Sequence, residues 1–138
     1  MTLRLAELVD VSTFPPNEDG SVRFDLTGQR IAGARVPLEW VLRSWLTPRG
    51  VLRNRARGID VREMENATFG PGDLDRWRAA MVAEAEAVEY VSTCAVGLVL
   101  DAREVIIAAE VTLVDGKTYT LAVRIAEAKL FVEIGGAQ

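Results

Sequence analysis

Histidine is absent from the 138 residues of this chain, and cysteine occurs once, at Cys94. Without an imidazole the chain lacks the usual general base, the usual zinc ligand and the middle member of a Ser-His-Asp triad. A lone cysteine excludes an internal disulfide, and the apolar neighbours of Cys94 predict a small core residue. Much of enzyme chemistry is thereby excluded, and we expect no catalytic residues, no cofactor and no metal.

Long apolar runs are also missing, since no stretch approaches the roughly 18 residues that a membrane-spanning helix needs. The opening MTLRLAELVD reaches an acid too early for a secretory signal, so we expect the chain to be made and used in a cytoplasm. Apolar residues at 49% and charged residues at 26% are typical of a folded soluble protein. The length suits a single domain over residues 1–138.

Motifs that carry chemistry are equally scarce. Glu86 and Glu89 lie one helical turn apart, but an acidic helix face is ordinarily solvated, so a glycosidase-like acid and base is the weakest hypothesis. The stretch NEDGS lacks the ligand spacing of a calcium loop, and GPG at residues 70–72 lacks the Lys-Ser/Thr of a phosphate-binding loop.

What the chain does have is an uneven distribution of charge. The net charge is −4, yet SWLTPRGVLRNRARGIDVRE, residues 44–63, carries Arg49, Arg53, Arg55, Arg57 and Arg62. Residues 63–110 are instead rich in acids. Such polarity suits a subunit that meets neighbours of opposite charge. A small nucleic-acid-associated or regulatory domain that uses the Arg49–Arg62 loop is the alternative, although no aromatic residue is interleaved for base stacking. The third possibility is that the arginines cluster by chance on a solvated surface and bind no partner.

The N-terminal half predicts an arm and then helices. Residues 1–35 read as an extended arm with a turn at FPPNEDGS and a short strand at 21–26. Residues 36–46 have apolar residues at helical spacing, and Asp60 with Glu63 forms a capping box for a short helix. A longer helix is expected over 73–91, with Glu84, Glu86 and Glu89 on its exposed flanks.

From residue 95 the apolar period changes from helical to two. Strands are expected at 95–100, 105–113 and 119–125, with Asp115 and Gly116 forming a tight hairpin turn. A last extended piece at 129–134 can add an edge strand or hang free. The chain thus divides into an N-terminal arm (residues 1–35), a helical part (36–91) and a sheet (95–134). The order favours an α+β fold with N-terminal helices packed on a C-terminal antiparallel sheet.

The order of these motifs resembles a known family. DLTGQRIAGARVPLEWVLRSWLTPRGVLRNRARGIDVRE, residues 25–63, is similar to the opening of the phage baseplate wedge family that includes the tail sheath initiator and its relatives in type VI secretion and tailocin baseplates. The resemblance extends over about residues 24–126, through the long helix and the strands with their Asp-Gly hairpin. The family's Glu-Pro-Arg motif after the long helix is represented here only by Glu89.

This resemblance implies a non-enzymatic structural subunit of a contractile-tail baseplate, assembled in the host cytoplasm and present in about six copies. Its partners would be baseplate wedge proteins, the tail sheath protein, and tail tube or hub proteins. We expect no membrane, and nucleic acid is the less favoured partner. Arg49, Arg53, Arg55, Arg57 and Glu89 are the candidate wedge-docking residues. The candidate residues for pairing with a sheath strand are Lys129, Leu130, Phe131, Val132, Glu133 and Ile134.

Overall fold

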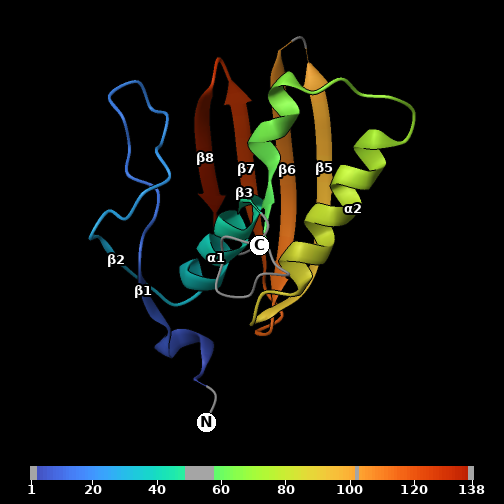
Figure 1. Cartoon of the computed structure of the whole chain (residues 1–138). Helices are drawn as coiled ribbons and strands as arrows, with labels where there is room; N and C mark the ends of the chain where they lie inside the picture. The colour runs from blue at the N-terminus through green and yellow to red at the C-terminus, as the bar shows by residue number, and fades with distance from the viewer. Residues whose placement is uncertain (1–2, 49–57, 102, 137–138) are drawn as a thin grey trace.

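The computed structural model describes residues 3–48, 58–101 and 103–136, and within them the chain has a mixed α+β fold (Figure 1). The elements are η1 (Leu5–Glu7), β1 (Val9–Val11), β2 (Arg30–Ala32), α1 (Arg35–Trp45), β3 (Leu46–Thr47), β4 (Ile59–Asp60), η2 (Val61–Asn66), α2 (Asp73–Glu86), β5 (Val91–Asp101), β6 (Glu104–Leu113), β7 (Thr118–Ala126) and β8 (Lys129–Gly135).

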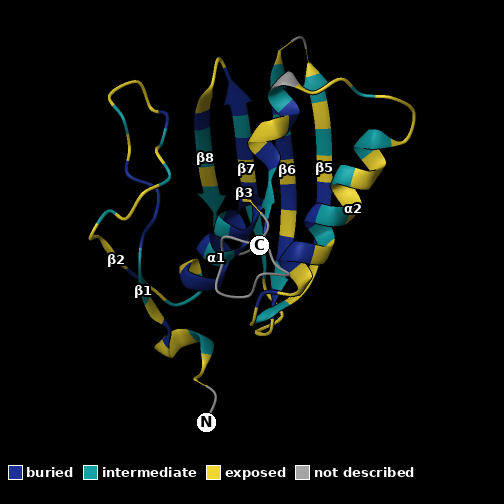
Figure 2. Ribbon diagram, in the orientation of Figure 1, coloured by how far each residue is buried: buried dark blue, intermediate teal, exposed yellow. Residues whose placement is uncertain are grey.

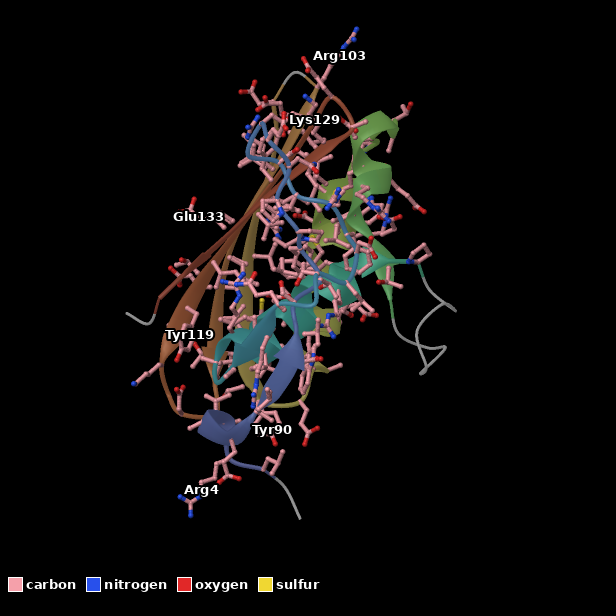
Figure 3. The ribbon with its side chains drawn as sticks, turned by 90° about the vertical axis from the view of Figure 1, so that its left-hand side faces the viewer. Arg4, Tyr90, Arg103, Tyr119, Lys129 and Glu133 are labelled. Atoms are coloured by element: carbon pink, nitrogen blue, oxygen red, sulfur yellow. The ribbon has the colours of Figure 1, made fainter. Side chains whose placement is uncertain are left out.

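The main sheet is antiparallel and has the order β5-β6-β7-β8, so β5 and β8 are its edges. The expected alternation is confirmed, since apolar residues at every second position of β6 and β7 are buried. Helices α1 and α2 and the short η2 lie on one side of the sheet, where these residues point (Figures 1 and 2). The other face carries exposed or half-buried side chains, among them Glu133, which points away from the helices in Figure 3.

Helix α1 is the most deeply buried helix. Its predicted range of 36–46 is confirmed within one residue, and Val36, Val41, Leu42 and Trp45 have no exposed surface. The Trp45 Nε1 donates a hydrogen bond of 2.9 Å to the Met81 carbonyl oxygen on α2, which satisfies the one polar atom of the indole. Burying each large apolar side chain contributes about 1.5–3 kcal/mol, so α1 anchors the helical layer to the sheet.

Two tight turns shape the sheet. The predicted Asp-Gly hairpin between β6 and β7 is confirmed, with Gly116 at φ 82° and the Lys117 N–H donating to Asp115 Oδ1 at 2.9 Å. The turn between β7 and β8 uses Glu127 and Ala128, both at positive φ, which is unusual without glycine or asparagine. Its Ala128 N–H donates to Glu65 Oε2 on η2 at 3.0 Å, which ties the turn to the helical layer.

The N-terminal arm departs from the prediction. The strand expected at 21–26 is wrong: Val22 makes only isolated bridges, to Pro16 and Leu130, and the arm's strands are instead β1 and β2. The segment instead donates single backbone hydrogen bonds to the preceding part of the arm, from Arg23 N–H to the Pro15 carbonyl oxygen and from Asp25 N–H to that of Thr13, without the continuous ladder of a strand.

Helix α2 also differs from its prediction. It ends at Glu86 rather than residue 91, because Ala87 caps it and Tyr90, at φ 76°, turns the chain into β5. The placement of Glu84 on an exposed flank is wrong, since only 7% of Glu84 is exposed. Within 60–66 the expected helix is a 3-10 helix, η2, whose first turn is capped by the Asp60 side chain. Among the described residues, no helix combines the length and the apolarity that a bilayer crossing requires.

Candidate functional site

The outer edge of β8 offers backbone groups for pairing. Leu130 directs its backbone away from β7, since its carbonyl oxygen accepts a hydrogen bond from Val22 N–H at 2.6 Å. Alternation along an antiparallel strand places the N–H and C=O groups of Val132 and Ile134 on the same outer side. Within the described part of the chain, neither residue makes a backbone hydrogen bond on that side. The six residues expected to pair with a sheath strand therefore fall into two sets. Leu130, Val132 and Ile134 direct their backbone groups outward, whereas Lys129, Phe131 and Glu133 direct theirs toward β7.

The N-terminal arm covers the beginning of this edge. Besides the bond from Val22 to Leu130, Lys129 Nζ lies 2.8 Å from Asp19 Oδ2. Hydrogen bonds from Lys129, and then from the Ser21 side chain and N–H, lower the pKa of Asp19 well below its usual range. Both side chains are about half exposed, so this ion pair is screened and fixes position more than it stabilises.

A buried carboxylate holds the base of the arm against α1. Glu39 is fully buried, and it accepts hydrogen bonds from the Ser12 hydroxyl at 3.0 Å and the Thr13 N–H at 3.0 Å. Arg35 Nε donates to the same carboxylate at 2.9 Å. A buried charge is tolerated only where such partners replace water, so the polar arm segment and the helix require each other. The sequence offered no signal for this contact beyond the acid within an apolar helix.

A second set of contacts lies beside the first. Arg43 donates to Asp10 Oδ2 at 3.0 Å and to the Val11 carbonyl oxygen at 2.6 Å, and Trp40 Nε1 donates to Asp10 Oδ2 at 2.8 Å. Burial alone would raise the pKa of Asp10, but the hydrogen bonds from Trp40, Val11 and Arg43 outweigh it and lower that pKa. Together with Glu39, Asp10 makes the arm an anchored part of the fold.

Most of the arginine segment lies outside the described residues, including Arg49, Arg53, Arg55 and Arg57. Arg62, the last of the cluster, has a structural role. Its guanidinium donates to both carboxylate oxygens of Asp60, at 2.8 and 3.1 Å, and to the Leu46 carbonyl oxygen at 3.0 Å. Arg62 therefore joins β3 to η2 and is not a free docking residue.

The two ends of the arginine segment are held close together. Strands β3 and β4 pair, with Thr47 opposite Ile59. Gly58 has φ 107°, and a Cβ added there would lie 2.6 Å from the Thr47 carbonyl oxygen, so only glycine fits. The Gly58 N–H donates to Glu84 Oε1 at 3.1 Å, while Glu84 Oε2 accepts from the Ser44 hydroxyl at 2.5 Å. Glu84 thus links α2 to Gly58 at the end of the arginine segment and to Ser44 on α1.

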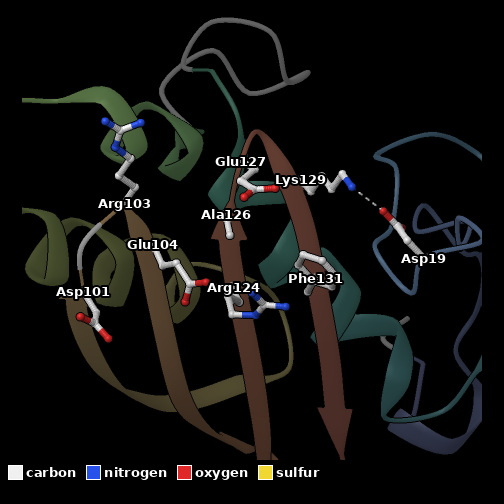
Figure 4. Close-up of a pocket in the computed structure, with 9 residues that line it drawn as sticks. All are labelled: Asp19, Asp101, Arg103, Glu104, Arg124, Ala126, Glu127, Lys129 and Phe131. Atoms are coloured by element: carbon white, nitrogen blue, oxygen red, sulfur yellow. Dashed lines mark hydrogen bonds and ion pairs between the residues drawn. The ribbon is translucent and has the colours of Figure 1, made fainter.

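A pocket of about 800 Å³ lies at one end of the open sheet face (Figure 4). It is lined by Asp19, Asp101, Arg103, Glu104, Arg124, Ala126, Glu127, Lys129 and Phe131. Arg124 pairs with Glu104 at 3.2 Å and stacks on the Phe131 ring, with Cζ 4.1 Å from its centroid. Because Lys129 pairs with Asp19, two of the three lining cations already have acidic partners. The lining of the pocket is therefore not that of an anion-binding site.

The remaining candidate residues are separate from these features. Glu89 is exposed in the turn between α2 and β5, and no hydrogen bond or ion pair joins it to Arg62. Cys94 is buried, as expected, and burial, with a further contribution from Glu86, raises its thiol pKa to about 12. No group of residues within the described ranges 3–48, 58–101 and 103–136 is arranged to hold a metal ion.

Comparison of the chain with known protein families finds no family that matches, and comparisons with curated proteins and with solved structures likewise find no match.

Proposed function

We propose that this protein is a structural, non-enzymatic subunit of a contractile-tail baseplate, joining the wedge and tail tube to the first ring of sheath. The observation that carries the proposal is the free backbone of Val132 and Ile134 at the outer edge of β8. An extended arm of a sheath subunit would add there as a further strand, with main-chain hydrogen bonds supplying adhesion and alternate side chains supplying register.

The arrangement of the helical layer supports this role. Helices α1 and α2 pack on one face of the sheet, and among the described residues no backbone hydrogen bond occupies the outer side of β8 beyond Leu130. An unprotected edge is a hazard for a free protein, because it invites pairing with any extended chain. A subunit whose edge is satisfied during assembly avoids that hazard.

The arginine segment supplies the second docking surface of the proposal. Its ends are fixed by β3–β4 pairing and by Glu84, while the chain between them carries Arg49, Arg53, Arg55 and Arg57. Arginine suits interface ion pairs, because its planar guanidinium meets carboxylates bidentately and is less strongly hydrated than lysine. The segment would contact acidic surfaces of the wedge proteins.

The first experiment is electron microscopy of particles from a strain that lacks the gene. Baseplates or tubes without polymerised sheath are expected, and normal contractile tails would overturn the proposal. Complementation with Arg53, Arg55 and Arg57 replaced by Glu is expected to give a folded subunit that does not enter baseplates. Normal incorporation of this variant would remove the arginine segment from the proposal. Salt-sensitive binding of the purified protein to DNA would favour the nucleic-acid alternative instead.

The edge itself is tested by a matched pair of proline variants. Val132→Pro removes an outward N–H from β8, and Leu98→Pro removes one from β5, the other edge of the sheet. We expect sheath attachment to fail in the first variant and to persist in the second. Hydrogen exchange gives an independent readout, since the Val132 and Ile134 amides should become protected when sheath binds to the unmodified protein. Unchanged exchange at both amides would contradict strand addition at β8.

A further inference from the structure

A groove runs along α2 on the side that faces β4 and η2. Its volume is about 410 Å³, and a smaller hollow of about 260 Å³ adjoins it. Ile59, Trp77 and Ala80 line both, so the two hollows form one continuous surface. This surface is distinct from the β8 edge and from the pocket on the open sheet face.

The floor of the groove is one side of α2. Trp77, Ala80 and Ala83 follow one another at three-residue spacing, which places them in a row along the helix. At 1.5 Å per residue the row is roughly 9 Å long, enough for about three residues of an extended chain. Beyond Trp77 the floor side chains are methyl groups, so a backbone or a small apolar side chain can approach closely.

The charge of the groove is negative. Asp60, Glu63 and Glu84 line its main part, where no lysine or arginine is among the described lining residues. Asp73 and Arg76 line the adjoining hollow and pair with each other. Asp60 is paired with Arg62, and Glu84 holds Gly58 and Ser44. Glu63 is exposed and forms no hydrogen bond or ion pair in the described part of the chain. Its carboxylate is therefore available to an incoming cation.

Trp77 completes the chemistry of the site. Its ring is only partly buried and lines both hollows, and a tryptophan face is the best aromatic partner for a guanidinium or ammonium group. Tryptophan is also among the residues that are enriched at the hot spots of protein interfaces. An aromatic face and a free carboxylate along one apolar groove together favour a cationic side chain on a short peptide segment.

We infer that this groove binds an extended segment of a partner protein that presents an arginine or lysine. The cation lies over the Trp77 ring and pairs with Glu63, and the neighbouring small apolar residues of the segment rest on Ala80 and Ala83. The inference does not depend on the proposed baseplate function, because it follows from the shape and charge of the groove alone.

The test uses the purified full-length chain and the peptide acetyl-Ala-Arg-Ala-Leu-Ala-amide, with a second peptide in which Glu replaces Arg. Each of Trp40, Trp45 and Trp77 gives one indole N–H signal in a proton–nitrogen NMR spectrum, and Trp77→Phe identifies its own. Addition of the arginine peptide is expected to shift the Trp77 signal saturably and to leave that of the fully buried Trp45 in place. No shift of Trp77, or an equal shift with the glutamate peptide, overturns the inference.

Two variants sharpen the result. Glu63→Gln is expected to weaken binding of the arginine peptide by about fivefold, the loss of one favourable charge contact beside an aromatic ring. Glu65→Gln is the matched control, because Glu65 lies on the same η2 helix but bonds to Ala128 and does not line the groove. Equal affinities of the two variants contradict the role of Glu63. If the peptide binds only after Arg53, Arg55 and Arg57 are replaced by Ala, the chain's own arginines compete for the groove. That result would overturn the inference of a partner protein as the occupant.

Discussion

The Val22 N–H donates to the Leu130 carbonyl oxygen at 2.6 Å, which places the N-terminal arm on the outer edge of the last strand. The contact uses the first outward-facing position of β8 and leaves those of Val132 and Ile134 beyond it. In the proposed assembly the arm would therefore determine where an added strand begins, because a register that overlaps Leu130 would have to displace Val22. A one-residue slip of an added strand would also turn each of its side chains to the opposite face of the sheet.

The anchoring of the arm predicts a large effect of a single buried acid. Glu39→Ala is expected to lower the free energy of unfolding by about 3 kcal/mol, because Ser12, Thr13 and Arg35 lose a shared buried acceptor. Urea denaturation followed by circular dichroism measures this value. Glu18→Ala, which removes an exposed acid from the same arm, is expected to change it by less than about 0.5 kcal/mol. Similar values for both variants would show that the Glu39 contacts contribute little.

Asp10 predicts how the stability depends on pH. Because its pKa in the folded protein lies below the unfolded value of 3.8, its ionised form contributes stability above that pH. This contribution is expected to fall as the pH drops from about 4 through the lower folded pKa. The stability difference between the unmodified protein and Asp10→Asn, measured by urea denaturation from pH 6 to pH 2, should therefore shrink. Asp25→Asn alters an exposed acid of the arm and serves as the control; a difference that stays constant for Asp10 would contradict the assignment.

The parts of the fold that were predictable from sequence are those governed by local pattern. The strands β6 and β7 follow their period of two, and Gly116 marks the turn between them. The turn at Glu127 and Ala128 was not predictable, because it lacks glycine and its Ala128 N–H donates to Glu65 on a distant element, η2. Local propensity carries no information about such a partner.

The candidate site was less predictable than the fold for a similar reason. Carboxylates on helices are ordinarily solvated, so Glu39 and Glu84 gave no sign of burial until their partners from the arm and from the β3–β4 region were known. Arg62 was grouped with the other arginines by proximity in sequence, whereas its position against Asp60 and Leu46 makes it structural. The groove at Trp77 combines segments that are distant in the chain.

Gly58 predicts a sharp difference between two alanine substitutions. Gly58→Ala is expected to destabilise the protein by about 2 kcal/mol or more, since φ is 107° and the new Cβ would press on the carbonyl oxygens of Thr47 and Pro48. Gly28 also has positive φ, 77°, but an added Cβ there meets no atom within 4 Å. Gly28→Ala should therefore lower the free energy of unfolding by only about 1 kcal/mol, the cost of holding alanine in a left-handed backbone conformation. Thermal denaturation compares the two, and equal losses would rule out a steric contribution at Gly58.

Cys94 provides a reporter of unfolding. With its pKa raised to about 12 from a usual value of 9.0, the fraction of thiolate at pH 8 is about a thousandfold lower than in the unfolded chain. Burial among the residues of the core also restricts access to a disulfide reagent. Labelling of the native protein by a chromogenic disulfide is therefore expected to be slow and to accelerate when urea populates the unfolded state. Glu86→Gln removes the smaller, electrostatic cause of the raised pKa, so native labelling should quicken only modestly. Rapid labelling of the unmodified native protein at pH 8 would contradict the burial of Cys94, because neither a protonated nor a shielded thiol can react at that rate.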